Sequence, residues 1–372
     1  MRRKLLALTM AACAAGLACD AEDPLEPLST PNPAVLPATG ASGITVMTRN
    51  IYLGFGIDQV LSGDLPLAQG LADLNATDFP KRAGMLAAEI QATRPHLIGL
   101  QEVIDYSMQV PSDIMIGNFT PNATDPVFHF LDILLDSMEA RGLDYVVAVN
   151  NPTTDVEVPI QVAPGVFADI RYTDHDVILA RSDVELGDAT AQVYAARLPV
   201  TIPPLPPTAR PLGYAAVEAV ANGTPLLFVT THLETQSFPA IQVAQAAELI
   251  DQLAGRELPI VLVGDFNSAA NPGAPAGKET ATYGMLLNAG YHDVWLRRNP
   301  FAAGLTCCFA SDLASAGAFD QRIDLILVRD GAGTLVGGVH TALVGVDPVS
   351  ASQPRWPSDH AGLVATLRLP QR

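Results

Sequence analysis

Short apolar runs recur along the chain, and most of them end in a polar or charged residue. They occupy residues 44–48, 97–100, 145–149, 177–180, 226–230, 260–263, 323–328 and 363–369. These runs are rich in Val, Ile and Leu and have no polar face, which is typical of strands that are buried on both sides. We therefore expect a buried sheet core with polar residues at the strand ends.

Segments with apolar residues at helical spacing lie between these runs, at 79–93, 128–141, 238–253 and 281–289. Strands mixed with helices predict an α/β or α+β fold. No repeat or break in composition interrupts residues 43–371, so we expect a single domain there. The irregular segment 105–127 and the proline-rich segment 199–211 are expected to be loops that face substrate or solvent.

The first 19 residues have the features of an export signal. Arg2, Arg3 and Lys4 precede a run of apolar and small residues that contains no acid and is too short for a comfortable membrane span. Cys19 follows a small residue, and the segment 20–42 contains five prolines and little that could pack, as expected of a tether. We expect residues 1–19 to be a signal peptide. Cys19 is then either the lipid-modified first mature residue, which we favour slightly, or is removed by ordinary cleavage nearby.

The charge balance limits the expected partners. The chain has 372 residues, with 21 basic and 39 acidic side chains, and its net charge is −18. Loss of residues 1–19 removes three basic residues and no acid, which leaves −21. Duplex DNA is bound largely through Lys and Arg contacts to phosphate, so this composition disfavours a DNA-binding protein unless a local basic cleft exists. Acidity that merely keeps an exported protein soluble is the alternative explanation.

Polar side chains that could perform chemistry follow the apolar runs. Asp265 and Asn267 come after the run 260–263 and alternate onto one face, where they could hold a hard cation or a phosphate. A simple turn would also explain them. The other candidates, each of which could instead be an ordinary strand or loop residue, are Asn50, Glu102, His232, Asp324, Asp359 and His360.

Beyond residue 19 the only cysteines are Cys307 and Cys308, which are adjacent in sequence. Adjacent cysteines do not close a long loop. A strained vicinal disulfide, two free thiols or a metal contact all remain open, and an unremarkable loop pair is the default interpretation.

The order of these polar residues resembles that of the endonuclease/exonuclease/phosphatase superfamily, which includes deoxyribonuclease I, exonuclease III, inositol polyphosphate 5-phosphatases and neutral sphingomyelinases. The matching motifs are VMTRN (46–50), IGLQEV (98–103), VTTHLET (229–235), VLVGDFNS (261–268), RIDLILV (322–328) and SDHAGLVATL (358–367). GDFN and SDH together are specific, whereas VMTRN alone is weak. The resemblance covers residues 43–371 and implies an α+β, four-layer α/β/β/α sandwich.

The resemblance also implies roles for individual residues. Glu102 would be the main ligand of Mg²⁺ or Mn²⁺, with Asn50 and Asp359 beside it. Asp265 would activate water, while His232 and Asn267 would contact the phosphate. His360, held by Asp324, would stabilise the developing charge.

One segment departs from the family pattern. Asp174, His175 and Asp176 stand where many members have glycines, so His175 is a candidate substrate contact, although an exposed loop histidine is the simpler explanation. Basic residues that grip DNA or inositol phosphates in relatives are not evident. We expect an exported phosphoesterase, on the outer surface, in the periplasm or secreted, that acts on phospholipid-type or small phosphodiesters. The alternatives are an extracellular nuclease and a non-catalytic, surface-anchored binding module.

Overall fold

The computed structural model describes residues 43–62, 64–317, 319–329 and 339–369. The expected signal peptide, Cys19 and the tether lie outside these residues. Across the described segments, no helix is both long and apolar enough to cross a membrane.

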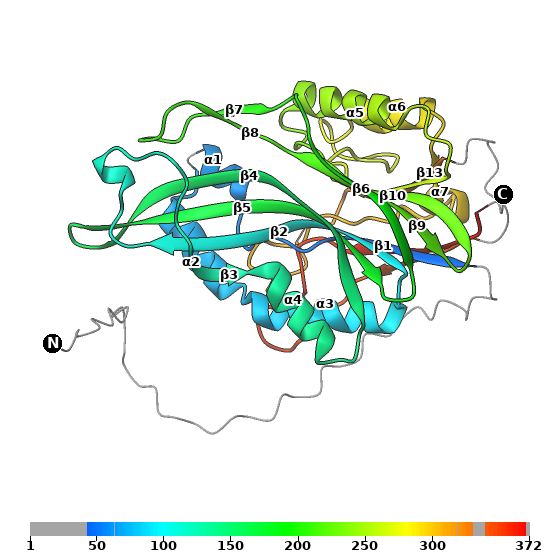
Figure 1. The fold of residues 1–372 in the computed structure, drawn as a ribbon, viewed down its shortest axis with the longest axis horizontal. Helices are drawn as coiled ribbons and strands as arrows, with labels where there is room; N and C mark the ends of the chain where they lie inside the picture. The colour runs from blue at the N-terminus through cyan, green and yellow to red at the C-terminus, as the bar shows by residue number, and fades with distance from the viewer. Residues whose placement is uncertain (1–42, 63, 318, 330–338, 370–372) are drawn as a thin grey trace.

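Two mixed β-sheets form the middle of the molecule (Figure 1). The first contains β1 (Ile44–Asn50), β2 (Leu97–Gln109), β3 (Asp125–His129), β4 (Tyr145–Ala163), β5 (Val166–Arg181), β14 (His340–Val344) and β15 (Gly362–Leu367). Its order is β14-β15-β1-β2-β5-β4, with β3 paired to β2. The second contains β6 (Glu185–Val193), β9 (Gly213–Ala221), β10 (Thr224–His232), β11 (Ile260–Asp265), β12 (His292–Asp293) and β13 (Asp324–Arg329). Its order is β12-β13-β11-β10-β9-β6.

Helices cover the outer face of each sheet (Figure 1). The first sheet packs against α3 (Phe79–Thr93) and α4 (Phe130–Glu139), and the second against α5 (Pro239–Leu253) and α6 (Ala281–Asn288). A third apolar core, which contains Val46 and Phe228, fills the space between the sheets. The predicted α+β, four-layer α/β/β/α architecture is therefore confirmed. Smaller helices are α1 (Ile57–Ser62), α2 (Leu67–Ala76), η1 (Ile114–Ile116) and α7 (Val294–Arg298).

The helical periodicity predicted the four main helices to within two residues at each end. The helix α3 shows why its boundary was readable. Asp78 caps its first turn by accepting a hydrogen bond from Lys81 N at 3.3 Å, and the helix ends just before Arg94 and Pro95.

Both segments expected to be loops contain strand. The segment 105–127 begins inside β2, because β2 continues to Gln109 against the long β4–β5 hairpin. The proline-rich segment 199–211 contributes to a small hairpin of β7 (Leu198–Val200) and β8 (Thr208–Arg210). Proline is tolerated there because the hairpin stands alone, outside both large sheets.

Strand register places polar residues of the second sheet in one row. His232 on β10 is level with Asp265 on the parallel strand β11, and Asp265 is level with Asp324 on β13. In the first sheet, Asn50 ends β1 beside the parallel strand β2. The two sheets are joined beneath these residues by a hydrogen bond from Gln101 Nε2 to Thr230 Oγ1 at 2.7 Å.

Candidate active site

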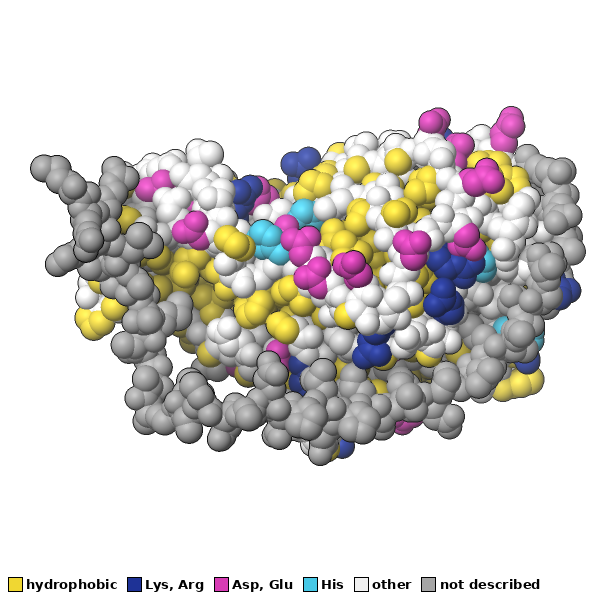
Figure 2. Space-filling view, turned by 60° about the horizontal axis from the view of Figure 1, so that its bottom comes forward, with side chains coloured by type: hydrophobic (Ala, Val, Ile, Leu, Met, Phe, Trp, Pro, Cys, Tyr) yellow, Lys and Arg dark blue, Asp and Glu magenta, His cyan; other side chains and the backbone are white. Residues whose placement is uncertain are grey.

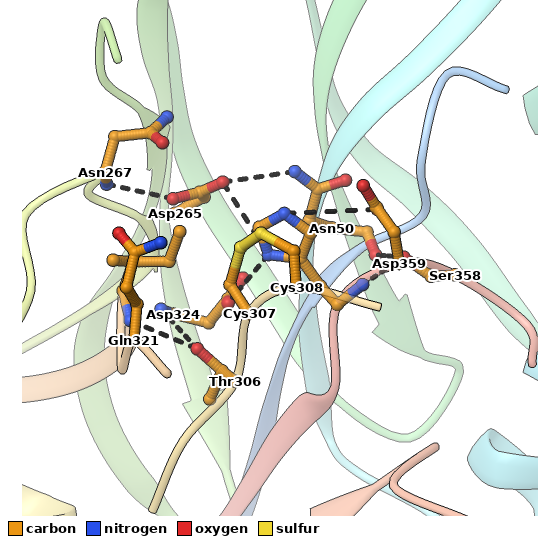
Figure 3. The surroundings of a disulfide bond; sticks show 12 residues. Asn50, Asp265, Asn267, Thr306, Cys307, Cys308, Gln321, Asp324, Ser358 and Asp359 are labelled. Atoms are coloured by element: carbon orange, nitrogen blue, oxygen red, sulfur yellow. Dashed lines mark hydrogen bonds and ion pairs between the residues drawn. A yellow bond between two sulfur atoms is a disulfide. The ribbon is translucent and has the colours of Figure 1, made fainter. Parts of the chain in front are cut away.

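The candidate residues meet in one polar cavity of about 190 Å³ at the edge of the two sheets. Its walls include Glu102, His232, Asp265, Asn267, Asp359 and His360. Asn50 and Asp324 are fully buried and lie behind this wall, in hydrogen-bond contact with it. Figure 3 shows Asp265 and Asn50 pointing toward each other, with Asp359 on the far side of Asn50. All eight residues named from the strand ends are thus brought together.

A β-bulge in β2 turns Glu102 into the cavity. The pairing of β2 with β5 shifts between Leu100 and Val103, and Glu102 has a positive φ of 57°. Bulges of this kind re-aim a side chain that regular alternation would send elsewhere. Asn50 Nδ2 then donates to both Glu102 Oε1 at 2.8 Å and Asp265 Oδ2 at 3.1 Å, so one amide links carboxylates from the two sheets.

The turn after β11 fixes Asp265 and Asn267. Gly264 has φ of 149°, and a Cβ there would lie 2.0 Å from the Thr231 carbonyl oxygen, so only glycine fits. Asp265 Oδ1 accepts a hydrogen bond from Asn267 N at 2.9 Å. The Asn267 amide donates to Leu233 O at 2.9 Å and lies 3.2 Å from His232 Nε2. Backbone contacts therefore hold the carboxylate and the amide before any ligand arrives, and the amide in turn contacts the imidazole.

His360 is oriented by Asp324 across a distance of 2.9 Å between Nδ1 and Oδ2. Asp324 is itself fixed by its backbone N–H, which donates to Thr306 Oγ1 at 3.1 Å. Ser358 Oγ accepts from His360 N at 3.1 Å and donates to the Asn50 carbonyl at 2.8 Å. Together these bonds set the ring plane and place a proton on Nδ1.

The two histidines of the cavity differ in charge near neutral pH, one being neutral and the other cationic. Burial, together with positive charge on Arg210 and His360, lowers the pKa of His232 to about 3. Burial also opposes the charged form of His360, but Asp324, Asp359 and Asp265 outweigh it and hold the pKa of His360 well above its usual value. His360 is thus the cationic imidazole and His232 the neutral one.

The acidic groups of the cavity fit a hard divalent cation. Burial, with like charge from Asp324 for Asp265 and from Glu102 for Asp359, raises the pKa of both carboxyls to about 7. Asp359 Oδ1 is buried and has no hydrogen-bond donor among the described residues. Carboxylate and amide oxygens are the ligands that Mg²⁺ and Mn²⁺ prefer. A cation among Glu102, Asp265 and Asp359 would remove the mutual repulsion that these shifts record.

Two other arrangements near His360 fit a metal less well. Asp265, Asp324 and His360 place ligand atoms within 4.8 Å of one another, but the facing nitrogen of His360 is protonated through Asp324. Cys307 and Cys308 also approach His360, yet they form a vicinal disulfide and offer no thiolate. The cation is therefore better placed on the Glu102 side of the cavity.

Comparison with known proteins places this geometry in a family. The model of the endonuclease/exonuclease/phosphatase family matches residues 50–360. The chain belongs to this family. No curated protein matches it.

Solved structures of the family have the same fold. The endonuclease/exonuclease/phosphatase from Beutenbergia cavernae is 21% identical, with a TM-score of 0.53, over 88% of this chain and 72% of that one. A family protein from Bacteroides thetaiotaomicron is 16% identical, with a TM-score of 0.53, over 88% and 98%. A mannosyl-6-phosphatase from the same species is 17% identical, with a TM-score of 0.50, over 87% and 98%. At this identity the likeness establishes the fold.

The structure does not bring His175 into the cavity of this family member. Its Nδ1 lies 2.7 Å from Asn150 Oδ1 and its Nε2 lies 3.4 Å from Asp105 Oδ2. Since side chains alternate along β5, the neighbouring Asp174 lines the cavity instead. The prediction that His175 faces the site is therefore wrong, and Asp174 takes its place in the wall of the cavity.

A basic residue that the sequence did not reveal also lines the cavity. Arg210, at the end of β8, is largely buried, and its Nη2 lies 2.9 Å from Glu234 Oε1. Its position inside a proline-rich segment gave no signal, because the pattern around it predicted only a loop. Arg210 supplies positive charge beside His232.

Cys307 and Cys308 are joined as a vicinal disulfide, which is one of the states that the sequence left open (Figure 3). Cys307 forms an isolated β-bridge with His360 and another with Gln321. The backbone at the disulfide therefore pairs directly with the backbone of the cationic residue His360.

We expect the metal-free protein to lose stability as pH rises from 5 to 8. Asp174, Asp265 and Asp359 have folded-state pKa values near 7, against about 4 when unfolded, so the folded state holds more protons between these values. His232, with its lowered pKa, acts in the opposite direction but is a single group. Thermal unfolding in EDTA should show a falling Tm, with a shallower slope in Asp174→Asn. A flat or rising Tm would contradict these shifts.

Proposed function

We propose that the protein is an exported, Mg²⁺- or Mn²⁺-dependent hydrolase of phosphodiesters, of the phospholipid type or small. One observation carries this proposal. Acidic, amide and imidazole side chains from both sheets line one cavity and are held there by hydrogen bonds before ligand binding. Together they offer a cation site, a base for water and a cationic group for the phosphate.

The chemistry follows from the positions and charges of these groups. A cation bound at Glu102 would neutralise charge on the phosphate oxygens. Asp265, with a pKa of about 7, is suited to accept a proton from the attacking water near neutral pH. The imidazolium of His360 stabilises the negative charge that develops on the phosphoryl group. The amide of Asn267 is placed to donate a hydrogen bond to the phosphate. The neutral ring of His232 completes the wall around it.

The distribution of arginine weighs against the nuclease alternative. Five arginines could have built a basic groove. Four are paired with acids: Arg49 with Glu89, Arg171 with Asp155, Arg181 with Asp183, and Arg322 with Asp293. The fifth, Arg355, lies over the ring of Trp356. On the face seen in Figure 2, basic side chains form small separate groups rather than a continuous track. A duplex would meet a net charge of −18 for the whole chain with few phosphate contacts to offset it.

The non-catalytic alternative is less favoured because the set of site residues is complete. A scaffold that only binds has no need for a buried base beside an oriented imidazolium.

Export rests on residues 1–19 and anchoring on Cys19, and both stay predictions.

The test is a panel of substrates with Mg²⁺ and with EDTA. It contains bis(p-nitrophenyl) phosphate, sphingomyelin and phosphatidylcholine vesicles, inositol phosphates, mannose 6-phosphate and supercoiled plasmid. We expect turnover of diesters that requires the metal, and faster turnover of lipid or small diesters than of plasmid. Efficient nicking of plasmid with no turnover of lipid would favour the nuclease, and no turnover of any substrate would favour the binding module.

A further inference from the structure

A second and larger cavity of about 550 Å³ opens directly beside the polar one. The two cavities share Phe55, Ile57, Tyr172 and Arg210 in their walls, so they adjoin each other. The larger cavity lies within the size range of small-molecule sites, which is about 300–1,000 Å³. Its position means that a ligand with its phosphate in the catalytic cavity would extend into it.

The larger cavity is mainly apolar, and three separate segments build it. The region of α1 and α2 contributes Val60 and Leu71, the β4–β5 hairpin contributes Val156 and Val158, and the proline-rich segment contributes Val200 and Ile202. In Figure 1 the β7–β8 hairpin extends over the same side of the molecule as α1. All six of these aliphatic side chains are only partly buried, although they face one concavity.

Aromatic rings form the junction between the two cavities. Tyr106 packs edge-on against Tyr172, with 5.7 Å between the ring centroids, and lies 6.5 Å from Phe55. Arg210 stands at the same junction, with its guanidinium paired to Glu234. The lining is thus charged in the smaller cavity and mainly apolar in the larger one, with only these residues between them. This matches the charged headgroup and apolar chain of an amphiphile.

We propose that the larger cavity binds the alkyl chain of an amphiphilic phosphodiester whose phosphate occupies the catalytic cavity. This inference rests on the proposed function and narrows its substrate to lipid-like esters. Two observations select this occupant. The larger cavity shares part of its wall with the catalytic cavity, which suits an alkyl chain joined to a phosphate, and most of the lining of the larger cavity is apolar. Water released from the aliphatic walls would supply the binding free energy.

The test is the affinity for n-alkyl phosphocholines of four, six, eight and ten carbons, all kept below micelle-forming concentration. Titration calorimetry would use the full-length Asp265→Asn protein with Mg²⁺, so that the probes are not consumed. Each methylene that leaves water should tighten binding by up to about fourfold, so we expect at least a tenfold lower Kd for octyl than for butyl phosphocholine.

Variants of the cavity wall test where the alkyl chain binds. Val158→Trp fills the cavity and Ile202→Asn makes its wall polar, and each should reduce the octyl-to-butyl ratio of affinities to near one. Leu186→Trp, at an exposed position on β6, is the matched control and should keep the wild-type ratio. Circular dichroism verifies that each variant is folded. If Val158→Trp does not fold, the variant Ile202→Asn, which lies in a loop, still tests the inference.

The outcomes separate this inference from the proposed function. Equal affinity for all chain lengths, or a length dependence that survives both cavity variants, overturns the inference and indicates that another part of the chain or a second copy covers the cavity. The proposed function is tested separately, by wild-type turnover of bis(p-nitrophenyl) phosphate, which needs no alkyl chain. If the wild type turned over no bis(p-nitrophenyl) phosphate but bound the probes in a length-dependent way, the cavity assignment would stand and the proposed catalysis would be rejected.

Discussion

Replacing Asp265 with asparagine is expected to lower kcat for bis(p-nitrophenyl) phosphate by about 10²–10⁴-fold, which is the usual contribution of a positioned general base. The amide keeps the size of the carboxylate and one acceptor oxygen, which can still receive the hydrogen bond from Asn267 N. It cannot take a proton from water. The measurement is steady-state turnover at saturating Mg²⁺.

The control for this substitution is Asp188→Asn, which makes the same exchange at an exposed position on β6. It should leave kcat unchanged. Circular dichroism should show that both variants are folded. If Asp265→Asn retained more than about a third of wild-type kcat, Asp265 would not be the base, and His232 would become the next group to test.

Removing the metal should abolish activity, and Glu102→Gln should reproduce part of that loss. Glu102 presents one oxygen to Asn50 and the other to Leu53 N, so glutamine keeps the shape but loses the charge that holds a cation. We expect the Mg²⁺ concentration for half-maximal activity to rise by at least about 10–100-fold, which is the range seen when groups that only support the ligands of a metal are changed. High Mg²⁺ should then restore part of the activity.

A second readout for the metal is thermal stability. A ligand that binds only the folded protein stabilises it by about 2.7 kcal/mol at 100 times its Kd, so Mg²⁺ should raise the Tm of the wild type. Glu102→Gln should respond less, whereas the exposed exchange Glu185→Gln should behave as the wild type. Full activity in excess EDTA would refute the metal assignment.

The apolar runs predicted the strands that matter most for the site. Residues of β1, β10 and β11 are buried on both faces, so their sequences show mainly apolar runs that lead into a polar residue at the end. Asn50, His232 and Asp265 could be located in this way because a strand interior has no place for them. Asp324 was located in a similar way, as the polar residue that begins β13.

Tertiary contacts decided what the sequence could not. Glu102 appeared to end a strand, but β2 continues past it, and its orientation depends on a bulge set by pairing with β5. Arg210 reaches the cavity only because the β7–β8 hairpin folds back toward it. The β4–β5 hairpin was predicted in fragments, since much of it projects beyond the helices and alternates only weakly.

The central place of β1 in its sheet has a consequence for the order of folding. It pairs with β2 on one side and with β15 on the other, so Ile44 lies opposite Leu367 near the far end of the chain. Contacts this distant in sequence form slowly, because loop closure must precede them. Asn50 and His360 flank this pairing, and their surroundings stay incomplete until the last strand has docked. A polypeptide whose synthesis has not yet reached β15 therefore lacks the arrangement of Asn50 and His360 that the folded protein has.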